Sequence, residues 1–253
     1  MTDYREFSEL LCKSRYAVAL TGAGISVESG IPDFRSKNGL WSRYDPSEYA
    51  SIEAFRSNPG KVWKMLAEMD ALFSSAQPNA AHLALSELEQ LGIIKVVVTQ
   101  NIDSLHQRAG SSNVVEFHGH FRSLHCDRCL RIRMRDDALF DILPPLCSCG
   151  GILRPDIIFF GEGIPTEAFS LAIEAAEKCD LMLIVGTSAT VVPASQLPRI
   201  AKRRGAKLLE INPGDSELSG WLTDAHIPEP AGRALGAVIE IVREMRFSTL
   251  SGI

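Results

Sequence analysis

The sequence predicts an α/β fold: a doubly wound parallel sheet with a smaller, discontinuous domain. Three observations predict it. Short apolar runs end in small or polar residues, helical patterns lie between several of them, and two segments interrupt this alternation. The chain of 253 residues is long enough for one large domain that carries a smaller insert.

Five apolar runs predict buried parallel strands, because their apolar residues do not alternate with polar ones. They are residues 16–21, 93–99, 113–117, 181–186 and 207–211. Three helices are expected between or after them. These are residues 79–91, with an asparagine cap, residues 165–178, with Thr166 as the cap, and residues 198–205, which end at Gly205.

Two segments do not fit the alternation. Residues 36–75 are rich in aromatic side chains, with short helical patterns and a turn at residues 58–60, and residues 120–159 contain a cysteine cluster. Because strands continue after each segment, we expect a discontinuous main domain. Its parts are residues 1–35, 76–119 and 160–253, and the two interrupting segments, a helical module and a zinc module, form the small domain.

Charge and hydropathy exclude several classes of protein. The net charge of −5 argues against a protein whose main task is to bind a phosphate backbone. The uncharged run at residues 181–198 is too polar to span a bilayer, and the N-terminal sequence has no secretory signal. We therefore expect a cytoplasmic monomer with no membrane and no nucleic-acid partner.

A glycine-rich turn follows the first predicted strand directly. In TGAG at residues 21–24, glycines allow main-chain amides to approach a diphosphate, and the helix that follows adds a favourable dipole. The dinucleotide fingerprint requires a third glycine where Val27 stands, so this turn alone has a purely structural alternative. The continuation GIPDFRS at residues 30–36 offers Arg35 to a phosphate and Phe34 to a ring.

Polar side chains follow the second and third predicted strands. Gln100, Asn101 and Asp103 stand at the carboxyl end of a parallel strand, where α/β folds bind ligands, and their groups suit a carboxamide such as nicotinamide. The alternative is a helix cap at Asn101 or Asp103. His118 follows the third strand and is a candidate general base, although a single histidine is more often structural.

Four cysteines lie within 24 residues, as Cys126-x2-Cys129 and Cys147-x-Cys149. In a reducing compartment this clustering favours a metal over disulfides, and four thiolates suit a closed, structural zinc site. A zinc ribbon that binds nucleic acid is the alternative. However, residues 131–135 alternate arginine with apolar residues, as in a half-exposed strand, and neighbouring acids dilute the charge.

In their order along the chain these motifs resemble those of the sirtuins (Sir2 family), the NAD-dependent protein lysine deacylases, of the bacterial and archaeal type. The resemblance covers about residues 12–245 and rests on GAGISVESGIPDFRS, TQNIDSLH, His118-Gly119, the four cysteines, RPDIIFFGE and the ends of the last two strands. It implies a Rossmann-like NAD-binding domain with a smaller, discontinuous zinc-binding and helical domain. NAD and an acyl-lysine protein or peptide would meet between the two domains. NAD is consumed to give nicotinamide, O-acyl-ADP-ribose and free lysine.

The resemblance also implies roles for individual residues. His118 and Asn101 are the implied catalytic residues, with His118 as the base that deprotonates a ribose hydroxyl. The implied NAD-binding residues are Gly22, Ala23, Gly24, Asp33, Phe34, Arg35, Gln100, Asn101, Ile102, Asp103, Gly186, Thr187, Ser188, Asn212 and Ala231. The extended apolar segment RPDIIFFGE either offers its main-chain edge to a peptide as an added strand or is a buried connector. The resemblance implies acyl-lysine contacts in it at Ile158, Phe160 and Gly161. One structural Zn²⁺ is implied at the four cysteines.

The acyl pocket is predicted from a difference between this chain and one branch of the family. One branch of the family carries a Tyr-x-x-Arg pair that binds negatively charged acyl groups, and this chain has Leu66 and Met69 at the corresponding places. A pocket without a cation disfavours a buried carboxylate and gains about 0.8 kcal/mol per buried methylene. We therefore expect acetyl or longer fatty acyl substrates rather than succinyl or malonyl.

Three alternatives to a deacylase stay open. A protein ADP-ribosyltransferase would use the same NAD site and transfer ADP-ribose to a protein or to water. A nicotinamide oxidoreductase would need a site for a hydride acceptor, and the missing third glycine argues against it. A non-enzymatic NAD-sensing or zinc interaction module would not depend on His118.

Overall fold

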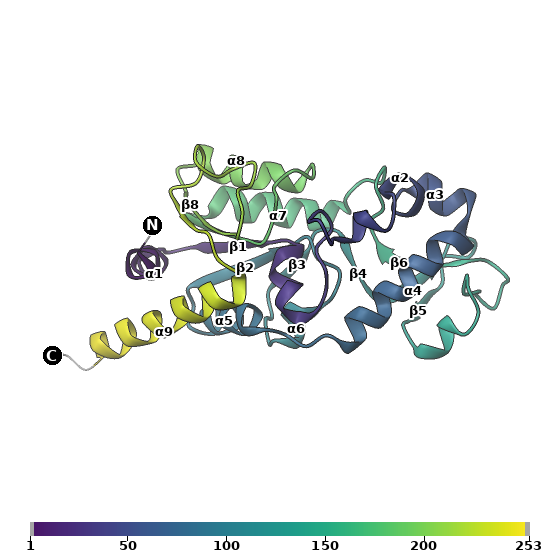
Figure 1. Ribbon diagram of the computed structural model, residues 1–253, viewed down its shortest axis with the longest axis horizontal. Helices are drawn as coiled ribbons and strands as arrows, with labels where there is room; N and C mark the ends of the chain where they lie inside the picture. Colours follow the sequence, from purple (N-terminus) through teal and green to yellow (C-terminus); the bar gives the residue numbers. More distant parts are fainter. Residues whose placement is uncertain (1–2, 251–253) are drawn as a thin grey trace.

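The computed structural model describes residues 3–250, with side chains to residue 247. Residues 1–2 and 251–253 of the expected main domain lie outside this part. Figure 1 shows an elongated molecule, with the large sheet and its helices at one end and a smaller sheet with a long helix at the other. No helix of the described part combines the length and apolar character needed to cross a membrane.

The large sheet has six parallel strands in the order β3-β2-β1-β7-β8-β9. Their bounds are β1 Ala17–Thr21, β2 Ile94–Thr99, β3 Val114–Glu116, β7 Leu181–Val185, β8 Lys207–Ile211 and β9 Ala225–Ile227. The five expected strands are confirmed to within one residue at each end, and β9 is an additional strand. The strand order reverses between β1 and β7, as in doubly wound sheets.

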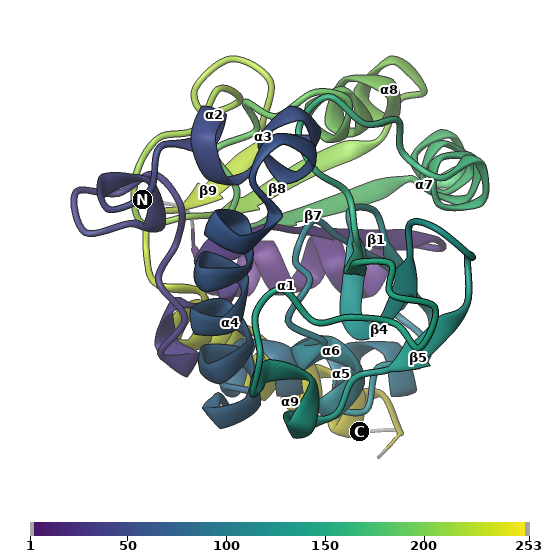
Figure 2. The same cartoon turned by 90° about the vertical axis from the view of Figure 1, so that its right-hand side faces the viewer.

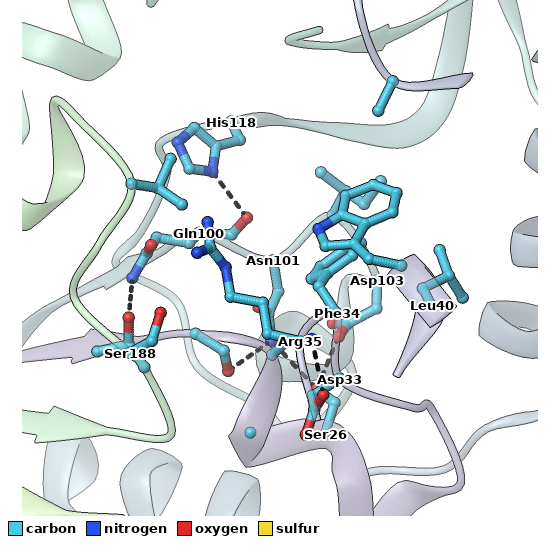
Figure 3. A pocket seen from close by; sticks show the side chains of 18 of the residues that line it. Ser26, Asp33, Phe34, Arg35, Leu40, Gln100, Asn101, Asp103, His118 and Ser188 are labelled. Atoms are coloured by element: carbon cyan, nitrogen blue, oxygen red, sulfur yellow. Dashed lines mark hydrogen bonds between the residues drawn. The ribbon is translucent and has the colours of Figure 1, made fainter. Parts of the chain in front are cut away.

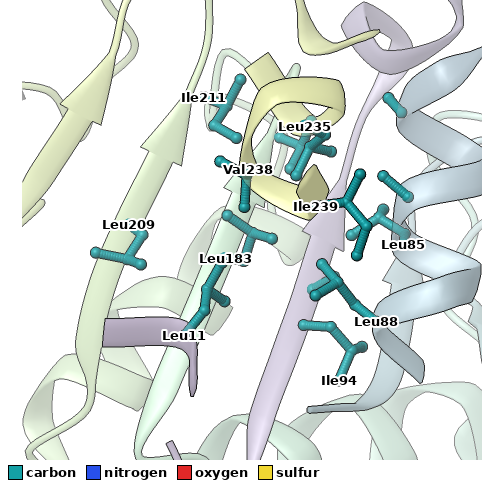
Figure 4. Close-up of a cluster of buried hydrophobic side chains, with 14 of the residues drawn as sticks. Leu11, Leu85, Leu88, Ile94, Leu183, Leu209, Ile211, Leu235, Val238 and Ile239 are labelled. Carbon is teal, nitrogen blue, oxygen red and sulfur yellow. The ribbon is translucent and has the colours of Figure 1, made fainter. Parts of the chain in front are cut away.

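Helices cover both faces of this sheet (Figures 1 and 2). One face carries α1 Tyr4–Lys13, α5 Ala80–Gln90 and α9 Ala231–Leu250, and the other carries α7 Thr166–Lys178 and α8 Leu197–Arg203. Figure 4 shows the first of these layers, where Leu85, Leu183 and Leu235 meet in one apolar cluster. Strands buried on both faces explain why the sequence contains continuous apolar runs.

The three expected helices are confirmed, and one expected cap is wrong. The Asn79 side chain caps α5, where it accepts a hydrogen bond from Ala81 N at 2.8 Å. Pro165, not Thr166, occupies the N-cap position of α7, with extended backbone (ψ 133°) and no side-chain cap bond. Thr166 already has helical conformation in the first turn, so its hydroxyl does not cap the helix. Gly205 follows α8 in the left-handed conformation.

A three-stranded antiparallel sheet in the order β5-β4-β6 forms the small end of the molecule. Its strands are β4 Gly119–Cys126, β5 Ile132–Met134 and β6 Leu153–Ile157. A strand within residues 131–135 is confirmed, but the expected half-burial is wrong, because all three residues of β5 are exposed. β5 lies at the edge of the small sheet, and no other element of the described chain covers either of its faces.

Residues 36–75 form helices that pack on this small sheet. They are α2 Pro46–Tyr49, α3 Ile52–Ser57 and α4 Pro59–Ser75. The turn expected at residues 58–60 is the start of α4, where Asn58 accepts from Lys61 N at 3.0 Å and Pro59 takes the first position. Trp63 of α4 is fully buried and donates its indole N–H to Leu153 O of β6 at 3.0 Å. The two interrupting segments thus share one apolar cluster.

The remaining elements are short. They are α6 Leu105–Arg108 and the 3-10 helices Ala23–Ser29, Leu40–Ser42, Asp137–Phe140 and Ala194–Gln196. The 3-10 helix Ala23–Ser29 takes the place of the helix expected after the glycine-rich turn. It consists of seven residues of 3-10 helix instead of a regular α-helix.

Candidate active site

A cavity of about 620 Å³ lies at the carboxyl ends of β1, β2 and β7, between the large sheet and the small end of the molecule. This is the point where the strand order reverses, and open α/β sheets bind ligands there. Its volume is in the range of sites for small molecules and cofactors.

The cavity brings together nearly all of the predicted ligand-binding residues. Its wall includes Gly22, Ala23, Gly24, Asp33, Phe34, Arg35, Leu66, Met69, Gln100, Asn101, Ile102, Asp103, His118, Ile158, Phe160, Gly161, Gly186, Thr187, Ser188 and Asn212. Ala231 does not line it, and its side chain is buried in the apolar cluster at the start of α9. The individual roles stay predictions, and Ala231 has the least geometric support among them.

The glycine-rich turn packs directly on the turn that follows β7. Gly24 N donates to Gly186 O at 2.8 Å, and a Cβ on Gly24 would lie 2.7 Å from Gly186 Cα. A Cβ on Gly22 would lie 2.8 Å from Thr187 Cβ. Both glycines are therefore required by the contact between two strand ends, whatever ligand approaches them. Val27 is exposed and has no close packing that would demand a third glycine.

The loop from Asp33 to Trp41 is closed by its own hydrogen bonds. Asp33 Oδ1 accepts from Arg35 N at 3.0 Å, and Leu40 N donates to Asp33 O at 2.8 Å. Among the described residues that line the cavity, Arg35 is the single lysine or arginine, and its guanidinium has no ion pair. Figure 3 shows Arg35 at the same cavity as His118. A guanidinium without a protein partner at this place suits a diphosphate.

Ser26 holds the two polar residues that follow β2. Its Oγ donates to Asp103 Oδ2 at 2.7 Å and accepts from Asn101 Nδ2 at 3.2 Å. Asp103 Oδ1 also accepts from Leu105 N at 2.9 Å, so the helix-cap interpretation of Asp103 holds alongside its place in the cavity wall. Burial raises the pKa of the Asp103 carboxyl, and these hydrogen bonds oppose the rise. Ser26 was not singled out from the sequence, although it stands inside the glycine-rich motif.

Two buried histidines lie behind this group. The ring of His106 is 5.0 Å from that of His82, and His106 Nε2 is 2.9 Å from Thr21 Oγ1. Burial lowers the pKa of His82 to about 4. Burial, with the neighbouring His82, lowers the pKa of His106 to about 3. Both rings are therefore neutral near pH 7, and they form a polar but uncharged floor under the cavity residues.

His118 stands at the turn between β3 and β4, in the cavity wall. Its Nδ1 lies 3.1 Å from Gln100 O, and because a carbonyl only accepts, Nδ1 carries the proton and Nε2 holds the lone pair. Burial lowers the pKa of His118, and the bond to Gln100 partly offsets this. A neutral imidazole with a free Nε2 is the form that a general base requires. His120 and His125 do not line the cavity.

The wall formed by α4 is apolar. Leu66 and Met69 are both buried and line the cavity, as do Met65 and Phe73, which the sequence analysis did not nominate. The acids next to Leu66 and Met69 in the sequence have partners elsewhere. The Glu68 carboxylate lies 2.7 Å from Arg43, and the Asp70 carboxylate lies 2.5 Å from Arg135 of the zinc module.

Arg154 holds the segment that follows β6. Its guanidinium donates to both carboxylate oxygens of Glu162, at 2.8 and 2.6 Å, and to Ile157 O at 3.1 Å. It is buried and lies over the Phe159 ring at 5.1 Å. Phe160 N in turn donates to Ala50 O at 2.8 Å, so one edge of this segment is already paired with the helical module.

The four cysteines form a compact group away from the cavity. Their sulfur atoms lie within 4.8 Å of one another, with Cys126 and Cys149 at 3.5 Å and Cys129 and Cys147 at 3.7 Å. A tetrahedral zinc with Zn–S bonds of about 2.3 Å separates its sulfurs by about 3.8 Å. A Cβ on Gly151 would lie 2.6 Å from Cys126 Sγ, so the short Cys-x-Cys pair needs this glycine. The residues fit a closed, structural zinc site.

Fold and site together define an α/β protein with a dinucleotide-sized cavity, one candidate base and a structural zinc module. The comparison with known families agrees: the model of the Sir2 family matches residues 22–193. The chain belongs to the Sir2 family. The family and fold class predicted from the sequence are confirmed.

Relatives and solved structures match over almost the whole chain. "NAD-dependent protein deacylase 2" of Pyrobaculum aerophilum is 45% identical, over 93% of this chain and 94% of that protein. "NAD-dependent protein deacetylase" of Saccharolobus solfataricus is 46% identical, over 95% and 98%. A Sir2 homologue–NAD complex superposes with a TM-score of 0.89 at 42% identity, covering 97% of this chain and 95% of the other. A Sir2 mutant with a deacetylated p53 peptide and 3'-O-acetyl ADP-ribose gives 0.90 at 38%, covering 94% and 98%.

Proposed function

We propose that the protein is an NAD-dependent protein lysine deacylase, which consumes NAD and yields nicotinamide, O-acyl-ADP-ribose and free lysine. The observation that carries this proposal is the position of His118. It is a neutral base with a free Nε2, and it shares one cavity with the unpaired Arg35 and with Asn101. Solved Sir2 structures with NAD, and with a deacetylated peptide and acetyl-ADP-ribose, support the same reaction.

The cavity residues fit NAD by their chemistry. Arg35 is a free cation for the diphosphate, Asn101 and Asp103 offer hydrogen-bonding groups to the carboxamide, and the strand ends at residues 186–188 and at Asn212 suit ribose hydroxyls. When bound, NAD supplies a ribose carbon that becomes electrophilic as nicotinamide leaves.

His118 acts as the base in this proposal. Its Nε2 accepts the proton of a ribose hydroxyl, and the Nδ1–H bond to Gln100 O keeps the ring oriented and stabilises the imidazolium that forms. Ser26 fixes the amide of Asn101 and the carboxylate of Asp103, so these groups are oriented before a ligand binds. The zinc module supports the site without taking part in the reaction.

We propose that the acyl-lysine binds along Ile158, Phe160 and Gly161, with its acyl group toward Leu66 and Met69. The apolar wall of α4 favours acetyl or longer fatty acyl groups over succinyl or malonyl, because no cation of the described cavity wall other than Arg35 is present to pair with an acyl carboxylate.

The main domain comprises residues 1–35, 76–119 and 160–253 in this proposal, and residues 36–75 and 120–159 form the small domain.

The test compares wild type with two variants. Each is incubated with NAD⁺ and a panel of acyl-lysine peptides, and mass spectrometry follows nicotinamide, deacylated peptide and O-acyl-ADP-ribose. We expect His118→Ala to lower the deacylation rate at least about 100-fold, the range for loss of a general base. His120→Ala, which changes a neighbouring histidine outside the cavity wall, should retain activity. No acyl loss with any peptide contradicts the proposal, and label transferred from radioactive NAD⁺ to protein favours an ADP-ribosyltransferase.

We further propose that the protein acts as a cytoplasmic monomer on acylated proteins. The exposed hydrophobic residues of the zinc module, such as Leu130 and Ile142, are compatible with contact to a protein substrate. Size-exclusion chromatography with light scattering tests the oligomeric state, and a mass of twice the 27.7 kDa of the chain would contradict a monomer.

A further inference from the structure

Trp41 lies between two parts of the site that come from distant segments. Its ring is 4.9 Å from the ring of Phe34 and 6.4 Å from the ring of Phe160. Phe34 belongs to the loop proposed to bind NAD, and Phe160 to the segment proposed to bind acyl-lysine. All three side chains line the cavity, so they form a continuous row of aromatic contacts along its wall.

The two ends of this row are anchored independently. Trp41 N donates to Phe34 O at 3.0 Å, so Trp41 is part of the closed loop that carries Arg35. Phe160 is paired instead with the start of α3, where Ile52 N donates to Phe160 O at 3.0 Å. The ring contact between Trp41 and Phe160 therefore joins two pieces of main chain that are held by different neighbours.

The indole of Trp41 is held differently from the other two tryptophans. The N–H groups of Trp63 and Trp221 donate to Leu153 O at 3.0 Å and to Glu217 O at 2.9 Å. Within residues 3–247 the indole N–H of Trp41 has no hydrogen-bond acceptor. Its orientation therefore depends on packing, to which the contacts with Phe34 and Phe160 contribute, and a change at either end of the row removes part of this packing.

We propose that Trp41 is a positioning residue that couples NAD binding to acyl-lysine binding. This proposal rests on the proposed deacylase function. A ligand that orders either end of the row also fixes the Trp41 ring, and the second ligand then meets a partner that is already ordered. Because coupling between two binding sites is reciprocal, each ligand increases the affinity for the other by the same factor.

Calorimetric titration measures this factor. ADP-ribose is titrated into the protein with and without a saturating acetyl-lysine peptide. No turnover occurs, because ADP-ribose carries no nicotinamide leaving group. We expect the peptide to tighten ADP-ribose binding about fivefold or more in the wild type, the usual lower range for coupled sites. Trp41→Leu should bring this ratio close to 1, and Trp41→Phe should restore most of it. Trp221→Leu, which removes an exposed tryptophan outside the cavity wall, should leave it unchanged.

Phe160→Leu tests the other end of the row and keeps the proposal open to contradiction if Trp41→Leu is unstable. It should lower the ratio as Trp41→Leu does, and the double variant should show no further loss, since one contact is removed in all three. A ratio near 1 in the wild type, or an unchanged ratio in Trp41→Leu, overturns the proposal. Failure of the deacylase function is distinct, because wild type would then release no deacylated peptide.

Discussion

Nδ1 of His118 lies 3.1 Å from the carbonyl oxygen of Gln100, so the main chain after β2 determines which ring nitrogen of the candidate base is free. Gln100 is itself tied to the residues that follow β7, because its side-chain amide donates to Thr187 Oγ1 at 3.0 Å. The tautomer of His118 therefore depends on the main chain at Gln100, which is held between the ends of β2 and β7 at the cavity.

The first prediction concerns the pH dependence of the reaction. Burial lowers the pKa of His118 from its ordinary value of 6.5, and a base acts in its neutral form. The value of kcat/KM should therefore be constant near neutral pH and fall only below pH 6.5, as His118 becomes protonated. A pH–rate profile with a good acetyl-lysine peptide measures this. An acid limb centred above pH 6.5 would contradict the assignment of His118 as the base.

The second prediction concerns stability in acid. The pKa of His82 is lowered to about 4 in the folded protein, so between pH 6.5 and pH 4 the unfolded chain binds a proton at this residue and the folded chain does not. The contribution of neutral His82 to the free energy of unfolding is therefore fully present above pH 6.5. It is lost as the pH falls toward 4, by about 1.4 kcal/mol per pH unit for each such histidine. Urea unfolding at pH 7.5 and pH 5 should show a smaller loss for His82→Gln than for wild type or His120→Gln. Equal losses in all three would argue against a buried, neutral His82.

Much of the fold could be predicted because its signals are local. Strands buried on both faces are recognised in the sequence as continuous apolar runs. The glycine-rich turn and the Cys-x2-Cys pair are each recognised from a few consecutive residues. β9 was missed because Ala225–Ile227 is only three residues long and is defined by its pairing with β8. The Thr166 cap was wrong because proline and threonine both suit a helix start, and only the backbone conformation decides between them.

The missed parts of the site depend on contacts between distant segments. Asp70 and Arg135 meet only because the two interrupting segments pack on each other. Trp41 of the first segment meets Phe160, which follows the second segment in the chain. No local pattern in either partner indicates the other. The glycines at residues 22 and 24 were predicted as ligand contacts, and the structure adds a second reason for them, the close approach of two strand ends.

The third prediction concerns the zinc module. We expect one zinc ion per chain by inductively coupled plasma mass spectrometry. Cys147→Ser should release the zinc and lower the melting temperature, because metal binding stabilises a module with little core of its own. Cys12→Ser, which changes a cysteine outside the cluster, should keep both the zinc and the melting temperature. A wild-type protein that contains no zinc after purification without chelators would contradict the prediction.

The fourth prediction concerns the buried ion pair of Arg154 and Glu162. Removal of one partner of a buried pair leaves an uncompensated charge, so Arg154→Ala should lower the free energy of unfolding by about 3–5 kcal/mol. Arg154→Lys keeps the charge but loses the bidentate hydrogen bond to Glu162. This variant should raise KM for the peptide more than it lowers kcat. Arg243→Ala, which breaks the more exposed pair with Glu87, should cost much less stability. Equal effects of the two alanine variants in urea unfolding would contradict this ranking.

The fifth prediction concerns acyl selectivity. The wild type should remove acetyl or a longer fatty acyl group faster than succinyl, because Leu66 and Met69 form an apolar wall. Met69→Arg introduces a guanidinium beside the acyl group, and Asp70 does not neutralise it because it already pairs with Arg135. A hydrogen bond to a charged group contributes about 1.5–3 kcal/mol, so the ratio of succinyl to acetyl kcat/KM should rise at least about tenfold. Met69→Leu is the matched control and should keep the wild-type preference. A wild type that prefers succinyl-lysine would contradict the apolar pocket.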